Sequence, residues 1–211
     1  MLKLFRASSL SEIMTDPKSK SEILSVGAKS AVTRMAKEFI YGYKEEVSSK
    51  YMEKGLRVED QSIELLNSVL FTDFKKNAER RNNAWITGEA DIVDHDRIID
   101  IKSSWSLKTF PALEADGMDK EYEWQGRAYM MLWEKPIFEI AYCMVSTPDE
   151  LIGYEQKSMH QVDGIERNLR VTLVTYERDL ELEEKIKIKV NAARAYLEEV
   201  IEEITKEHIH G

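Results

Sequence analysis

The sequence predicts an α/β fold in which helices flank a small mixed β-sheet and a long helix ends the chain. Residues 84–103 hold two runs rich in Ile and Val around a polar corner, 94–97, which is the pattern of a β-hairpin. Apolar residues recur at helical spacing from 178 to 208, enough for one helix of roughly 45 Å at ~1.5 Å per residue. Three further segments show the same helical spacing: residues 28–47, 56–70 and 118–133.

Length and composition indicate a single domain. The chain has 211 residues, of which 43% are hydrophobic and 33% charged, enough for a substantial core, expected at about 28–177, followed by the helix 178–208. The net charge of −9 argues against a protein that coats nucleic acid by bulk electrostatics. A nucleic-acid partner would therefore require a local basic lining or metal ions.

The location expected from the sequence is a reducing cytoplasm, without membrane contact. Cys143 is the only cysteine, so no disulfide framework forms within the chain, and a core position is expected for it. No apolar run approaches the ~20 residues that cross a bilayer. The first residues also lack the apolar segment of a secretion signal.

The predicted hairpin concentrates charge on one face. Strands 84–93 and 98–103 joined by a two- or four-residue loop would place Asp91 opposite Asp100, and Glu89 opposite Lys102. Opposed carboxylates repel unless a cation lies between them or one holds a proton, and a hard divalent cation with oxygen ligands is the natural partner. The alternative is a solvated face. The opposite face is apolar and suits packing against helices: Ala90, Ile92, Ile99 and Ile101.

Glu59 is a further candidate carboxylate. The helix 56–70 has an apolar stripe made of Leu56, Ile63, Leu66 and Leu70. Glu59 falls on that stripe, where a carboxylate is rarely buried without a partner. It is either a functional residue or one at the edge of the stripe.

The N-terminal segment contains a candidate phosphate site. Residues 9–12 match the capping box S-x-x-E and predict the start of a short helix. Arg6 and Ser8 come just before it, and a helix N-terminus with a hydroxyl and a guanidinium can bind phosphate. A plain helix cap is the alternative.

Two more segments could contact DNA. A basic cluster precedes the hairpin, made of Lys75, Lys76, Arg80 and Arg81, with solvated charges as the alternative. In the helix 118–133, Gln125 and Tyr129 are four apart and adjacent on an aromatic face that would otherwise be core. The loop 104–117 is expected to border a cleft. The apolar run 137–145 predicts a buried strand and 171–176 a last one.

The order of these elements resembles the PD-(D/E)XK nuclease superfamily, in its RecB-like and lambda-type (YqaJ-like) phage exonuclease branch. Asp91 stands at the first metal-binding position, Asp100-x-Lys102 matches the (D/E)xK element, and Gln125-x-x-x-Tyr129 resembles the Q-x-x-x-Y helix motif. The segment 55–59 resembles the upstream Gly-x-x-x-Glu. Residues 6–9, Arg-Ala-Ser-Ser, are similar to the start of lambda-type exonucleases, where such residues hold the DNA 5′-phosphate. The likeness runs from about residue 6 to 145.

The resemblance implies a restriction-endonuclease-like core with a metal site. Asp91, Asp100, Glu59 and the carbonyl of Ile101 would hold one or two Mg²⁺ ions, for which Mn²⁺ could substitute. Lys102 would orient or help deprotonate the attacking water. Gln125 and Tyr129 would line the cleft. The four-cysteine iron–sulfur pattern of some relatives is absent, and many members have Glu at the position of Asp100.

The resemblance also implies an activity. It favours a 5′→3′ exonuclease on double-stranded DNA that serves recombination, with a single-strand annealing protein as partner and a ring trimer as assembly; a phage-encoded enzyme would act in the cytoplasm of its bacterial host. One alternative is a structure- or site-specific endonuclease on the same fold. Another is an inactive DNA-binding or assembly subunit that uses its C-terminal helix for docking.

Overall fold

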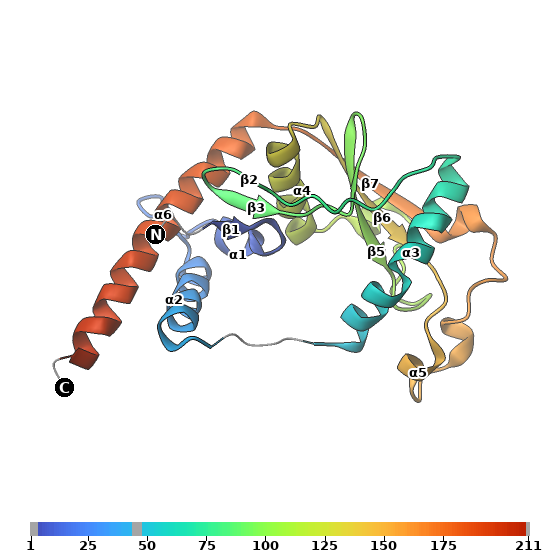
Figure 1. Cartoon of the computed structure of the whole chain (residues 1–211), viewed down its shortest axis with the longest axis horizontal. Coiled ribbons are helices and arrows are strands. Elements are labelled where there is room, and N and C mark those ends of the chain that lie inside the picture. Colours follow the sequence, from blue (N-terminus) through green and yellow to red (C-terminus); the bar gives the residue numbers. More distant parts are fainter. Residues whose placement is uncertain (1–3, 44–47, 210–211) are drawn as a thin grey trace.

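The computed structural model describes residues 4–43 and 48–209, so the last four residues of the predicted helix 28–47 lie outside it. The elements, drawn in Figure 1, are β1 (Phe5–Arg6), α1 (Ser11–Met14), α2 (Val26–Tyr41), α3 (Lys50–Leu70), β2 (Arg81–Asn82), β3 (Ile86–Gly88), β4 (Ile92–Val93), β5 (Arg97–Ser103), α4 (Lys120–Trp133), β6 (Ile137–Cys143), α5 (Asp149–Ile152), β7 (Val171–Glu177) and α6 (Leu180–Ile209). The mixed α/β class and the long last helix are confirmed.

The strands form two sheets where the sequence predicted one. β1, β3 and β2 make a three-stranded sheet, and β4, β5, β6 and β7 a four-stranded one in which only β5 and β6 are parallel. The predicted strand 84–93 is divided because β3 pairs with β1 and β2, whereas β4 pairs with β5. At Gly88 the chain lies so close to α4 that an added Cβ would stand 2.8 Å from the Tyr129 ring.

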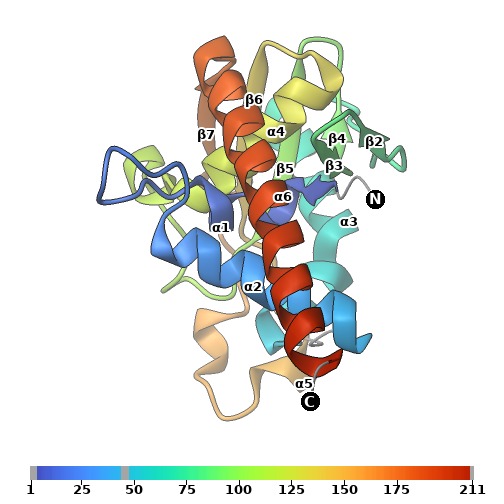
Figure 2. The ribbon, with the colours of Figure 1, turned by 90° about the vertical axis from the view of Figure 1, so that its left-hand side faces the viewer.

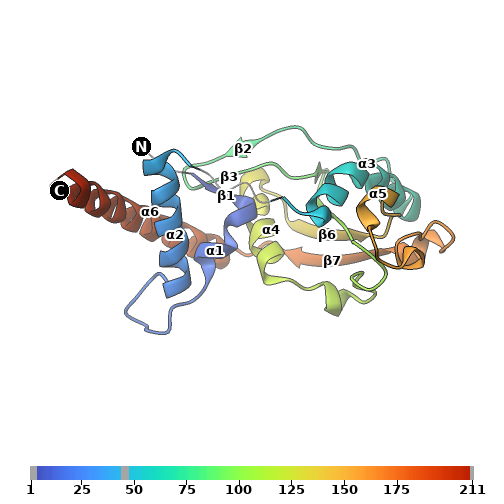
Figure 3. The same cartoon turned by 90° about the horizontal axis from the view of Figure 1, so that it is seen from below.

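Helices cover both faces of the four-stranded sheet, as Figure 3 shows for α3 and α4. Because side chains alternate along β5, Ile99 and Ile101 pack with the apolar residues of α3. Ile98 belongs to the larger core with α4 and α6. Asp100 and Lys102 share the α4 side with Ile98, so the face expected to be polar is covered by a helix.

Gly126 sets the distance between α4 and the sheet. A Cβ at this position would lie 1.9 Å from a ring carbon of Phe138 on β6, closer than any real contact. The absence of a side chain therefore lets the helix pack directly on the Phe138 ring. Its neighbour Gln125 reaches β5 as a consequence.

The apolar stripe of α6 is covered within the chain. Its buried residues are Ile186, Val190, Ala193, Leu197 and Val200, and they share one core with α2 and the N-terminal segment. Figure 2 shows α6 crossing the molecule with α2 beside it. This part of the helix thus packs within the chain, and docking of α6 on a partner subunit stays a prediction. That core also contains Phe5 and Leu10, which precede the expected start of the core at residue 28.

Two local predictions are wrong. The capping box does not form: residues 7–9 make a 3₁₀ turn that runs into α1, so Leu10 has helical angles (φ −64°, ψ −35°) at the cap position and no side chain caps the helix. Leu56 is 78% exposed. The buried side of α3 instead includes Lys54, Val58, Ile63 and Leu66.

Within residues 4–43 and 48–209, no helix is apolar over a sufficient length to cross a bilayer.

Candidate active site

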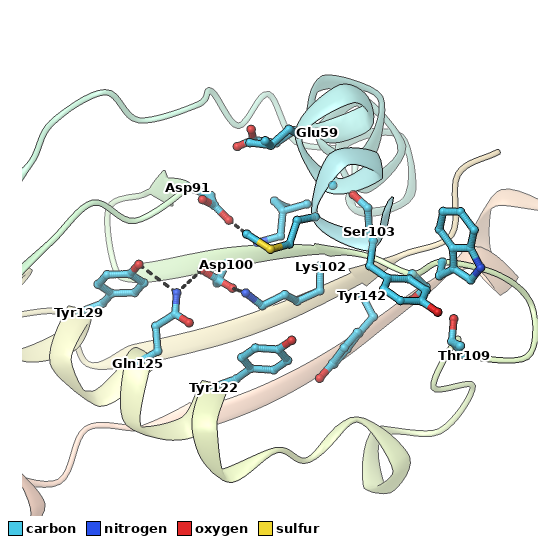
Figure 4. A pocket seen from close by; sticks show the side chains of 17 residues that line it. Glu59, Asp91, Asp100, Lys102, Ser103, Thr109, Tyr122, Gln125, Tyr129 and Tyr142 are labelled. Atoms are coloured by element: carbon cyan, nitrogen blue, oxygen red, sulfur yellow. Dashed lines mark hydrogen bonds and ion pairs between the residues drawn. The ribbon is translucent and has the colours of Figure 1, made fainter. Parts of the chain in front are cut away.

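The hairpin has the predicted register but is shorter than predicted. Ile92 pairs with Ile99 and Val93 with Ile98, and the N–H of Asp94 donates to the carbonyl of Arg97 at 2.9 Å. The ladder ends at Ile92, one residue before the expected pair of aspartates. A cleft of about 700 Å³ lies there, bordered by β5, α3, α4 and the loop after β5 (Figure 4). Ser104, Trp105 and Thr109 line it, which confirms the loop 104–117 as its border.

Asp91 lies against the open edge of β5. Its Oδ2 accepts a hydrogen bond from the N–H of Ile101 at 2.7 Å, which replaces the ladder bond that the hairpin lacks here. Burial, together with the nearby charge of Asp100, raises the pKa of Asp91 to about 7. The charge of Asp100 therefore acts on Asp91, as their predicted proximity implies, although the two residues are not paired in the β4–β5 ladder.

Asp100 is buried, and its two carboxylate oxygens have different partners. Its Oδ1 accepts from Nε2 of Gln125 at 3.0 Å, and its Oδ2 forms an ion pair with Nζ of Lys102 at 2.6 Å. Among the described residues, this Oδ2 has no hydrogen-bond donor besides the Lys102 ammonium. Gln125 also donates to the Tyr129 hydroxyl, which in turn donates to the carbonyl of Glu89, each at 3.0 Å. This chain of bonds ties α4 to the stretch between β3 and β4.

Lys102 projects into the cleft beside Asp100 (Figure 4). Burial lowers the pKa of Lys102, but the charge of Asp100 outweighs it and the net pKa is raised. The ammonium is therefore charged at neutral pH. It lies 4.2 Å from the centre of the Tyr122 ring.

Glu59 approaches the cleft from α3, above the aspartates in Figure 4. Its side chain is 17% exposed and forms an ion pair with Lys76. Within residues 4–43 and 48–209, no three His, Cys, Asp or Glu side chains converge as a ready metal cluster. Glu89 does not lie opposite Lys102. It pairs with Arg80 at 2.9 Å, because the chain leaves the hairpin before reaching that position.

The predicted DNA-contacting residues are distributed unevenly. Gln125 and Tyr129 line the cleft. In the basic cluster each cation has an acidic neighbour in the pairs Lys75–Asp73, Lys76–Glu59, Arg80–Glu89 and Arg81–Glu79. Arg6 is an exposed residue of β1 paired with Thr87, and Ser8 is exposed in the turn that follows. Neither residue lines the cleft.

Sequence reasoning missed several cleft residues. Tyr122 also lines the cleft, because its position three residues before Gln125 places it on the same side of α4. Tyr51 and Met52 come from the first turn of α3, which was not predicted to be helical. Lys54 is fully buried behind them and donates to the carbonyls of Ser104, Trp105 and Val145. The spacing of apolar residues along the sequence gives no signal that Lys54 is buried.

The donor set fits a hard divalent cation. Asp91 and Asp100 face one cleft, and the buried Oδ2 of Asp100 has the Lys102 ammonium beside it. Burial and the charge of Asp100 both raise the pKa of Asp91, and a cation bound between the carboxylates would offset these two effects. Carboxylate and carbonyl oxygens are the ligands that Mg²⁺ and Mn²⁺ prefer. Cys143 is buried in the core, where burial raises the pKa of its thiol to about 12.

Comparisons with known proteins give a consistent result. No protein-family model matches the chain, and neither does any curated protein. Among solved structures, the chain is similar to a phage-related exonuclease from Haemophilus somnus 129PT, with 36% identity over 97% of each chain and a TM-score of 0.91.

A second similarity is to LHK-Exo, an alkaline exonuclease from Laribacter hongkongensis that was also solved in complex with dAMP. It has 17% identity over 99% of this chain and 95% of that one, with a TM-score of 0.69, and shows the shared fold. The similarity to the Haemophilus protein extends through α6, beyond the part of the sequence that carried the resemblance. It favours an exonuclease over the endonuclease and inactive-subunit alternatives, and the chain belongs to the phage exonuclease branch of the PD-(D/E)XK nuclease superfamily.

Proposed function

We propose that this phage-type exonuclease hydrolyses double-stranded DNA from its 5′ ends in a reaction that depends on Mg²⁺, with Mn²⁺ able to substitute. The observation that carries the proposal is the pair Asp91 and Asp100 at an open strand edge, with Lys102 beside them in the same cleft. This is an arrangement that suits phosphodiester hydrolysis. It requires oxygen ligands, a cation near the phosphate and room for the substrate.

The metal would be held by Asp91, Asp100 and the carbonyl of Ile101. Glu59 would join them when its partner Lys76 turns to a DNA phosphate. A bound divalent cation lowers the pKa of a water ligand and offsets the charge that develops on the phosphate. Gln125 keeps Asp100 in position through its bond to Oδ1, while Oδ2, which is paired with Lys102, would be the oxygen that binds the metal.

Lys102 would act next to the scissile phosphate. Its ammonium is paired with Asp100, and with a metal held at Asp100 that ion pair would be weaker while the side chain still lined the cleft. It can then donate to the attacking water or to a phosphate oxygen, stabilising the transition state.

The DNA path would follow the cations around the cleft. Lys76 and Arg80, together with Lys75 and Arg81, flank the stretch that leads to Asp91, and phosphates could replace their acidic neighbours. Arg6 and Ser8 would receive the terminal 5′-phosphate at the three-stranded sheet. A local path of this kind is needed because the net charge of −9 repels DNA elsewhere.

The assembly proposed for the enzyme is a ring trimer that works with a single-strand annealing protein in recombination. Family membership supports this proposal. With DNA as its substrate, a phage-encoded enzyme would act in the cytoplasm of its bacterial host. Light scattering of the purified protein, alone and with a candidate annealing protein, tests the assembly; a monomeric mass would exclude the ring.

The function is tested with matched DNA substrates. Linear duplex should be degraded in Mg²⁺ or Mn²⁺ and persist in EDTA, and duplex with a 5′-phosphate should be digested faster than dephosphorylated duplex. Covalently closed circles should survive. Undiminished cleavage in EDTA would contradict the metal mechanism, and rapid nicking of circles would contradict the exonuclease.

Two substitutions separate the ligands from the lysine. Asp100→Ala should abolish both Mn²⁺ binding, measured by calorimetry, and cleavage. Lys102→Ala should keep metal binding but slow single-turnover cleavage by about 10²-fold or more, the scale of a lost acid–base or electrostatic group. Cleavage by Lys102→Ala at the parental rate would mean that Lys102 has no part in the chemistry.

A further inference from the structure

The ring of Tyr122 is the second contact of the Lys102 ammonium. Nζ of Lys102 lies 2.6 Å from Oδ2 of Asp100 and 4.2 Å from the centre of the Tyr122 ring. Figure 4 shows Tyr122 rising from α4 toward the lysine, on the side away from Glu59. A cation over an aromatic face is attracted by the ring quadrupole, and more strongly where water is partly excluded. The Lys102 side chain is 24% exposed, so the contact is largely shielded.

The contact is made by the ring, not by the hydroxyl. Between residues 4 and 209, the described part of the chain gives the Tyr122 hydroxyl no hydrogen-bond partner, whereas the hydroxyl of its neighbour Tyr142 donates to the carbonyl of Gly117 at 2.8 Å. Tyr142 is also the cross-strand neighbour of Lys102 on β6. Lys102 nevertheless makes its cation–π contact with Tyr122.

The two contacts of Lys102 respond differently to a metal. A divalent cation on Asp100 would compete with the ammonium for Oδ2 and weaken the ion pair. A neutral ring is not a metal ligand and would keep its contact. Without it, a lysine side chain has several rotamers of similar energy and would leave the cleft for water.

We infer that Tyr122 is a positioning residue that keeps the Lys102 ammonium at the scissile phosphate once metal occupies Asp100. The inference rests on the proposed role of Lys102 and adds to it a residue outside the Asp, (D/E)xK and Q-x-x-x-Y elements. α4 thereby has two tasks: Gln125 orients the carboxylate and Tyr122 orients the lysine.

The test is a double-mutant cycle in single-turnover cleavage. Tyr122→Leu should slow cleavage by roughly 3- to 30-fold, the rate equivalent of a shielded cation–π contact, with KM for DNA and calorimetric Mn²⁺ affinity unchanged. Tyr122→Phe retains the ring and should keep at least about half of the parental rate. In a Lys102→Ala background, Tyr122→Leu should cause no further loss, because the group it positions is gone.

A readout without metal completes the test. In the metal-free protein, acetylation of Lys102 followed by mass spectrometry should be faster in Tyr122→Leu than in the parent, since the ring no longer shields the Lys102 nitrogen or stabilises its unreactive charged form. Lys75, which is 76% exposed, serves as the internal reference and should react equally in both.

The outcomes distinguish the inference from the proposed function. If Lys102→Ala cleaves DNA at the parental rate, then Lys102 has no role in cleavage and the inference about Tyr122 fails as well. A slow Lys102→Ala beside a parental rate for Tyr122→Leu overturns the inference alone. Equal losses from Tyr122→Leu with and without Lys102, or unchanged acetylation, also overturn it, because they indicate a structural effect of the ring.

Discussion

At the scale of single residues, the cleft depends on charges whose partners are not adjacent in sequence. Asp100 has Gln125 and Lys102 on its two oxygens, and Glu59 has Lys76. The spacing of Asp100 and Lys102 on one strand predicts their shared face. Nothing in the spacing predicts that Glu59 is paired with Lys76, because that pair joins α3 to a segment without regular structure.

Lys54 provides a pH-dependent prediction at this scale. Burial lowers the pKa of Lys54 from 10.5 to about 8. Between these values the unfolded chain holds the proton and the folded protein does not, so the free energy of unfolding should rise with pH from about 8 to 10.5 through this group. Below pH 8 the burial cost of the ammonium is fully present.

Urea unfolding of the parent and of Lys54→Met at pH 7.5 and 10 measures this effect, since other titrating groups cancel in the difference. The parent should gain stability relative to Lys54→Met at the higher pH. At pH 7.5 the variant should still be less stable than the parent, because the carbonyls of Ser104 and Val145 lose their donor. A difference that is independent of pH would contradict the lowered pKa.

At the scale of elements, the position of α4 determines the site. Gly126 allows close packing on Phe138 and thereby brings Gln125, Tyr129 and Tyr122 to β5. The helix, and the presence of Gln125 on its aromatic face, could be predicted from the spacing of residues in the sequence. The distance between α4 and the sheet could not be predicted, because the sequence does not show which side chain Gly126 packs against.

Gly126→Ala tests this packing. A Cβ there would collide with Phe138, so we expect a loss of about 1–3 kcal/mol in the free energy of unfolding, with weaker cleavage as Gln125 moves away from Asp100. Gly55→Ala is the matched control on α3, since its Cβ would meet nothing within 4 Å. That control should gain roughly 0.5–1 kcal/mol. Equal effects of the two substitutions in urea unfolding would refute the proposed role of Gly126.

At the scale of the whole molecule, the ends of the chain complete the core. Phe5 and Leu10 pack in the same core as Val190 and Leu197 of α6. The three-stranded sheet formed by β1, β3 and β2 joins the N-terminal segment to the stretch that leads to Asp91. A long amphipathic helix is equally compatible with docking on another subunit, so the sequence alone did not identify its partner.

Two substitutions on α6 test where its stripe is buried. Val190→Asp places a charge in the core and should cost more than about 3 kcal/mol in the free energy of unfolding. Ile188→Asp lies on the exposed side, at 54% exposure, and should stay within about 0.5 kcal/mol. Thermal and urea unfolding provide the comparison. A mild effect of Val190→Asp would mean that α6 does not form part of this core.

What the sequence by itself determined follows from short-range rules. Strand alternation and hairpin register set the shared face of Asp100 and Lys102 and the pairing of Ile92 with Ile99. Helical periodicity located α3, α4 and α6, and the spacing of four residues made Gln125 and Tyr129 neighbours. These features depend on backbone geometry within one element or one turn.

Only the tertiary structure decided the features that join distant segments. The strand break between Gly88 and Ile92 separates β3, which pairs with β1 and β2, from β4, which pairs with β5. That break opens the edge of β5, where Asp91 bonds to Ile101 and the cleft forms. The pairing of Glu59 and the burial of α6 likewise depend on contacts that no local pattern encodes, because hydrophobic burial and charge pairing have no preferred separation along the chain.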